Sequence, residues 1–79
     1  MPIVFRSGRF KFFFYSNEGS PREPIHIHVR DENGEAKFWL FPASVATSEG
    51  FNARTLRELT KLVEDNTILI ERSWNEHFA

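Results

Sequence analysis

Residues 25–41 have the sequence IHIHVR-DENG-EAKFWLF, in which two segments of alternating side chains flank a polar tetrapeptide. Because side chains two residues apart on a strand point to the same face of a sheet, Ile25–Arg30 predicts a strand with one apolar and one polar face. The tetrapeptide ends in Asn33-Gly34, which is a strong turn signal, and Glu35–Phe41 is the expected return strand. This stretch therefore predicts a β-hairpin around which the rest of the fold is built.

Two registers fit this hairpin. A two-residue turn sets Glu32 opposite Glu35, which is repulsive, whereas a four-residue loop sets Arg30 opposite Glu35, which is attractive by on the order of a few tenths of a kcal/mol. We favour the second register. In both registers one face is apolar and is expected to form the core: Ile25, Ile27, Val29, Ala36, Phe38 and Leu40. The other face is expected to meet solvent: His26, His28, Arg30, Lys37, Trp39 and Phe41.

The segment before this hairpin predicts further strands. Residues 10–15 are rich in strand formers and follow Ser7-Gly8, which is typical of a turn, so Ile3–Arg6 and Arg9–Ser16 predict a second hairpin. Asn17–Pro24 is expected to be a loop, because neither of its prolines suits a central strand. The sheet is therefore expected to have four strands.

The segment after the central hairpin predicts helix. Pro42–Ser48 is expected to make one helical turn. The main helix should begin after Asn52, a good N-cap residue, and Phe51 can pack on Leu56 as a hydrophobic staple. An apolar stripe at steps of three and four residues supports this helix: Leu56, Leu59, Leu62, Val63, Ile70 and Trp74.

The sequence leaves open whether this helix is continuous through Asn66, which interrupts the stripe. Unbroken to His77, the helix would be about 37 Å long and would overhang a six-residue strand of about 20 Å. The overhanging part is apolar around much of its circumference, and exposed apolar area of this kind usually marks a protein contact. Together with the aromatic residues of the outer sheet face, it supplies the expected interface residues: Trp39, Phe41, Ile70, Trp74 and Phe78.

Composition narrows the class of protein. With 79 residues and no cysteine, the chain is expected to form a single domain over residues 1–79 without disulfides or thiolate metal sites. Its 10 Lys and Arg against 11 Asp and Glu do not favour nucleic-acid binding. No apolar run reaches the roughly 20 residues that span a membrane, and the N-terminus shows no signal pattern, so we expect a cytoplasmic protein without a membrane partner.

Several separate motifs occur along nearly the whole chain: FFFYSNEG at 12–19, PIHIHV at 24–29, GEAKFWL at 34–40, GFN at 50–52 and WNEHF at 74–78. Together they resemble the bacterial family called domain of unknown function 4160. The Pro-Pro-His-x-His-Val of that family appears here with Ile25 at the second proline, and both histidines are kept. The resemblance implies a strand-rich first half, a helical second half and a role in a toxin–antitoxin-like pair. It implies no established activity.

His26 and His28 are the most pointed candidates for chemistry. On a strand their Cβ atoms would lie about 7 Å apart on one face, which is compatible with two imidazoles on one metal ion. Zinc needs a third protein ligand, and a structural zinc needs a fourth. His77 is the third ligand that we assign if a metal is present, and Glu76 and Asp31 are the other candidates.

A second interpretation uses the same residues as an RNase-like hydrolase. His26 or His28 would act as general acid or base, and Arg30 or Lys37 would stabilise the charge that develops on phosphate. The catalytic candidates are then His26, His28 and Arg30. A third interpretation is structural, with both histidines on the polar face of the sheet beside Trp39.

The sequence thus predicts an α+β fold: a small, mainly antiparallel four-stranded sheet, a short helical turn and one long C-terminal helix packed on one face. The leading functional hypothesis is a non-enzymatic protein-interaction module that forms a homo-oligomer or binds a small protein partner. The alternative is the histidine-based hydrolase, so enzymatic activity stays open. No cofactor is expected, with zinc or manganese as the alternative if the histidines bind metal.

Overall fold

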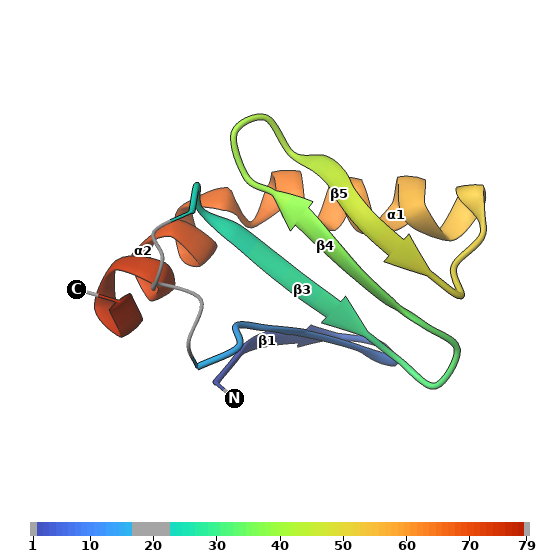
Figure 1. Ribbon diagram of the computed structural model, residues 1–79, viewed down its shortest axis with the longest axis horizontal. Helices are drawn as coiled ribbons and strands as arrows, with labels where there is room; N and C mark the ends of the chain where they lie inside the picture. The colour runs from blue at the N-terminus through green and yellow to red at the C-terminus, as the bar shows by residue number, and fades with distance from the viewer. Residues whose placement is uncertain (1, 17–22, 79) are drawn as a thin grey trace.

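The computed structural model describes residues 2–16 and 23–78, which form an α+β fold (Figure 1). Within these residues, five strands are followed by two helices: β1 (Ile3–Ser7), β2 (Phe10–Phe13), β3 (His26–Arg30), β4 (Glu35–Trp39), β5 (Ser44–Glu49), α1 (Ala53–Asp65) and α2 (Thr67–Phe78). The strands make one antiparallel sheet in the order β1-β2-β3-β4-β5, so each strand pairs with its neighbours in the sequence. The predicted fold class is confirmed, but the strand number and the helical part differ from the prediction.

The central hairpin has the predicted register. Arg30 lies directly opposite Glu35, so four residues form the loop between β3 and β4. The Asp31 carboxylate organises this loop, because its Oδ1 accepts hydrogen bonds from the amides of Asn33 at 2.7 Å and Gly34 at 3.1 Å. Such a side-chain bond to the backbone two residues on is the reason that Asp favours turns.

The fifth strand corrects the helical turn expected over Pro42–Ser48. β5 pairs with β4, with Lys37 opposite Thr47 and Phe38 opposite Val45. Val45 and Thr47 are β-branched residues, which favour a strand when an unpaired sheet edge is available beside them. The sequence expectation was wrong because it weighed the segment alone, whereas pairing with β4 decides its conformation.

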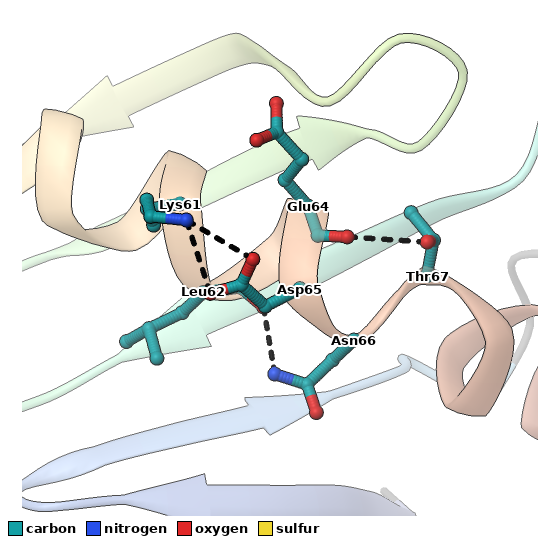
Figure 2. A network of polar contacts seen from close by, with 6 residues as sticks. All are labelled: Lys61, Leu62, Glu64, Asp65, Asn66 and Thr67. Carbon is teal, nitrogen blue, oxygen red and sulfur yellow. Dashed lines mark hydrogen bonds and ion pairs between the residues drawn. The ribbon is translucent and has the colours of Figure 1, made fainter.

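The long helix breaks at Asn66, which settles the question that the sequence left open. Asn66 has a non-helical backbone (φ −116°, ψ 20°), and its side-chain Nδ2 donates to the carbonyl oxygen of Leu62 at 2.8 Å (Figure 2). Thr67 makes a similar bond, donating from Oγ1 to the carbonyl oxygen of Glu64 at 3.2 Å. Such side-chain bonds satisfy carbonyl groups that a continuing helix would use, and α2 therefore starts in a new direction.

The core lies between the helices and one face of the sheet (Figure 1). The apolar face predicted for the central hairpin is confirmed, because Ile27, Val29, Ala36, Phe38 and Leu40 are buried and Ile25 packs against them. The helices contribute four buried side chains: Leu59, Val63, Ile70 and Trp74. Burying each large apolar side chain stabilises the fold by roughly 1.5–3 kcal/mol.

The start of α1 is as predicted. The Asn52 side chain accepts a hydrogen bond from the Thr55 amide at 2.8 Å, which makes it the N-cap. Phe51 and Leu56, the proposed staple pair, both pack against the core, and the Phe51 ring meets the Phe10 ring edge-on at 6.0 Å. Among the described residues, no helix is long and apolar enough to cross a membrane.

Candidate functional site

The sheet face opposite the apolar core face of the central hairpin, here called the histidine face, carries the candidate residues. Directly paired residues share a face, so the strand pairing arranges this face in rows. The first row runs across all five strands: Arg6, Lys11, Arg30, Glu35 and Glu49. The second row is Phe13, His28, Lys37 and Thr47, and the third is His26, Trp39 and Ser44.

His26 is a fully buried residue rather than the solvent-facing one that was expected. Its Nδ1 lies 2.9 Å from the carbonyl oxygen of Pro24, and a carbonyl only accepts, so Nδ1 carries the proton. Its ring lies 5.0 Å from the Trp74 ring and 5.7 Å from the Trp39 ring. The prediction missed this burial because Trp74 comes from α2, far along the chain.

His28 is 8% exposed and lies beside a tyrosine and a carboxylate. The Tyr15 ring meets the His28 ring edge-on at 4.6 Å, and the Tyr15 hydroxyl donates to Oε2 of Glu35 at 2.8 Å. The same carboxylate oxygen is 4.0 Å from Nδ1 of His28. His28 therefore faces a carboxylate that also accepts a hydrogen bond from Tyr15.

Two cationic side chains, Arg30 and Lys37, lie on either side of His28 and Glu35. The Arg30 guanidinium stacks 5.1 Å from the centre of the Phe13 ring and reaches Glu35 at 3.9 Å. The Lys37 ammonium pairs with Glu23 at 2.9 Å and lies 4.5 Å from the centre of the Trp39 ring. A shallow groove of about 320 Å³ opens here over β4 and β5, and its lining includes His28, Glu35, Lys37, Thr47, Ser48 and Glu49.

The proposed metal triad does not assemble. His77 is exposed on α2 and stacks on Phe14 with ring centres 6.2 Å apart, whereas His26 and His28 lie on the histidine face. Asp31, an alternative ligand, is already engaged by the loop amides and by Arg9. Within residues 2–16 and 23–78, no three His, Cys, Asp or Glu side chains come together in a way that could hold a metal ion.

Asp31, in the loop between β3 and β4, has a lowered pKa. Burial acts to raise its pKa, but the hydrogen bonds from the Asn33 and Gly34 amides and the Arg9 guanidinium at 2.8 Å outweigh that effect. The pKa of Asp31 is therefore lower than the ordinary value of 3.8. Asp31 stabilises the β3–β4 loop as a carboxylate.

The expected interface residues fall into three groups by exposure. Ile70 and Trp74 are buried in the core of the chain itself, because the break at Asn66 turns α2 back onto the sheet and removes the expected overhang. Trp39 and Phe78 are half-buried. Phe41 is 64% exposed and keeps the exposure that an interface residue needs. Ile68 and Leu69, which belong to the apolar segment that was expected to overhang the sheet and to form a contact, are exposed, at 74% and 39%.

Sequence reasoning missed Tyr15 and Glu35 as site residues. The signal was present, since Tyr15 shares the alternation of Lys11 and Phe13, which the pairing with β3 brings to the histidine face. Nothing in the alternation alone indicates which face of β2 joins which face of β3. That choice depends on the register between the two hairpins.

A family model described as a domain of unknown function, DUF4160, matches residues 10–75. The chain belongs to the DUF4160 family. The DUF4160 match includes β2 to β5, α1 and most of α2, so it contains Tyr15, His28 and Glu35. No curated protein and no solved structure matches the chain. The family suspected from the motifs is thus confirmed, and it carries no assigned activity.

Proposed function

We propose that this chain is a non-enzymatic protein-interaction module that works in the bacterial cytoplasm as a homo-oligomer or with a small protein partner. The observation that carries the proposal is the exposure of large apolar side chains on the β4–β5 connection and on the first turn of α2. Phe41 is 64% exposed, Ile68 is 74% exposed and Leu69 is 39% exposed. Removing such side chains from water is the main source of free energy in protein association.

The two sheet edges are less suited to binding. A register shift leaves Val4 of β1 without a direct partner on β2, and another leaves Ala46 of β5 without one on β4. Irregularities of this kind on edge strands oppose the addition of a further strand. We therefore assign the contact to the apolar side chains Phe41, Ile68 and Leu69 rather than to backbone pairing.

The partner context comes from the family resemblance. It supports a two-protein, toxin–antitoxin-like pair in which this chain binds a small protein. Self-association and binding of a second protein use the same surface in this proposal, so the same variants test both.

The test is light scattering coupled to size-exclusion chromatography, on wild type, Phe41→Ser and Ile68→Ser. Wild type is expected to elute as an oligomer, and each variant is expected to elute closer to the monomer mass. Ile3→Ser is the matched control, because Ile3 is also an exposed apolar side chain, at 41%, but lies on β1. A monomeric wild type at high micromolar concentration would argue against self-association.

The arrangement of His28, Glu35 and Lys37 favours a second candidate function, the acid–base hydrolase. His28 and Lys37 line the groove, and Nδ1 of His28 lies 4.0 Å from Oε2 of Glu35. His26 takes no part in this version, because it is fully buried. His28→Ala should then abolish cleavage of single-stranded RNA while the fold persists. A folded His28→Ala that cleaves as wild type does would remove this candidate.

A further inference from the structure

Three cations stand side by side in the first row of the histidine face. Arg6 on β1 is directly opposite Lys11 on β2, and Lys11 is directly opposite Arg30 on β3. Residues paired in this way have Cβ atoms roughly 4.5–5.5 Å apart, and like charges directly opposite each other destabilise a sheet. The fold thus keeps an arrangement that works against its own stability.

Two cations of this row, Arg6 and Lys11, have no acidic partner among residues 2–16 and 23–78. Both residues are exposed. The third cation, Arg30, lies 3.9 Å from the carboxylate of Glu35. A local rule that is broken in this way, here by the directly opposed Arg6 and Lys11, often marks a functional site.

Arg30 is also held in place for binding. Its guanidinium lies over the Phe13 ring, and its carboxylate neighbour Glu35 is fixed by the Tyr15 hydroxyl at 2.8 Å. A planar guanidinium held in this way loses little freedom on binding and can donate two parallel hydrogen bonds to a phosphate. Arg6 and Lys11 then add two charges within about 10 Å, the width of two strand spacings.

We propose that Arg6, Lys11 and Arg30 bind the phosphodiester backbone of a single-stranded nucleic acid that crosses β1, β2 and β3. A chain of regularly spaced anions fits a row of regularly spaced cations. The half-buried Tyr15 donates to Glu35, the neighbour of Arg30, and so provides an aromatic ring at the Arg30 end of the row. Cations near aromatic rings are the usual surface for single strands.

The rest of the row limits where this ligand lies. Glu35 and Glu49 continue it on β4 and β5, so a polyanion is repelled from that half of the sheet. This separation explains how a chain with a formal net charge of −1 can present a cationic surface. The inference does not depend on the proposed protein interface, which uses Phe41, Ile68 and Leu69.

The expected size of the effect follows from counterion release. For single strands the logarithm of affinity falls with the logarithm of salt concentration with a slope of about −0.7 per phosphate contact. Three contacts give a slope of about −2, so affinity should fall roughly 18-fold between 50 and 200 mM salt. Each lost contact should weaken binding about eightfold at 50 mM salt.

The experiment is fluorescence anisotropy of labelled oligouridylate and oligodeoxyuridylate with the full chain, with polyglutamate as competitor. Arg6→Gln and Lys11→Gln should each weaken binding about eightfold at 50 mM salt and reduce the salt slope. Lys61→Gln is the matched control, because Lys61 is 70% exposed on α1 and the charge change is the same. Melting temperatures should not fall in Lys11→Gln, since the substitution removes a repulsion.

Binding of either oligonucleotide with this pattern supports the inference, and a preference between the two reports whether the ribose hydroxyl is contacted. Three results would overturn it. The first is no binding of either oligonucleotide at 50 mM salt. The second is an equal loss in Lys61→Gln and Lys11→Gln. The third is equal displacement by polyglutamate, which would identify an acidic protein as the ligand.

Discussion

Replacing Trp74 by alanine distinguishes a core residue from an interface residue. Trp74 is 8% exposed, and its ring lies 4.3 Å from Phe78, 5.0 Å from His26 and 5.4 Å from Phe14. Truncating a buried aromatic side chain of this size typically costs about 3–5 kcal/mol. A domain of this length has a total stability of about 4–12 kcal/mol. Trp74→Ala should therefore remove about a quarter of the stability or more, and a domain at the lower end of this range would be unfolded.

The assay is urea denaturation of wild type and variant, followed by far-ultraviolet circular dichroism. Phe41→Ala is the control, because Phe41 is 64% exposed and its loss should change the free energy of unfolding by no more than about 0.5 kcal/mol. If Trp74→Ala costs less than about 1 kcal/mol with an unchanged slope against urea, the packing of α2 described here is wrong.

Three further changes follow from local geometry, each measured by urea denaturation. In Gly34→Ala the added Cβ would overlap the carbonyl oxygen of Glu49, so we expect the free energy of unfolding to fall by about 3 kcal/mol. Gly8→Ala is the control: Gly8 has a φ of 57° and open space around it, so the substitution should cost about 1 kcal/mol. Similar losses in the two variants would contradict the close approach of Gly34 to Glu49. The Asp31 carboxylate has a lowered pKa, so it stabilises the fold above pH 3.8, and that contribution disappears as pH falls through its folded pKa. Asp31→Asn should therefore be less stable than wild type at neutral pH. A stability difference between the two proteins that does not narrow in acid would refute this. Asn52→Ala should cost about 1 kcal/mol through loss of the N-cap bond, and a neutral result would show that the cap contributes nothing.

Local sequence signals predicted the central hairpin well. Charge pairing between Arg30 and Glu35 chose the right register, and side-chain alternation chose the right core face. Asn52 was identified as the N-cap because capping depends only on residues within one helical turn. These features are decided by neighbours in the sequence.

Features decided by distant contacts were not predicted. β5 forms because β4 offers an unpaired edge, which the composition of residues 42–48 does not indicate. His26 is buried because α2 brings Trp74 against it, and α2 can do so only because Asn66 ends the first helix. The expected metal triad depended on His77 reaching the histidine face, and the direction of α2 places it elsewhere.

Native mass spectrometry of the wild-type chain, with and without added zinc or manganese, tests most directly whether this protein is an interaction module. An interaction module should give an oligomer whose mass is unchanged by either metal and which dissociates in Ile68→Ser. A monomer that binds one metal ion, and loses it in His28→Ala, would contradict the account and make the histidine face the functional centre.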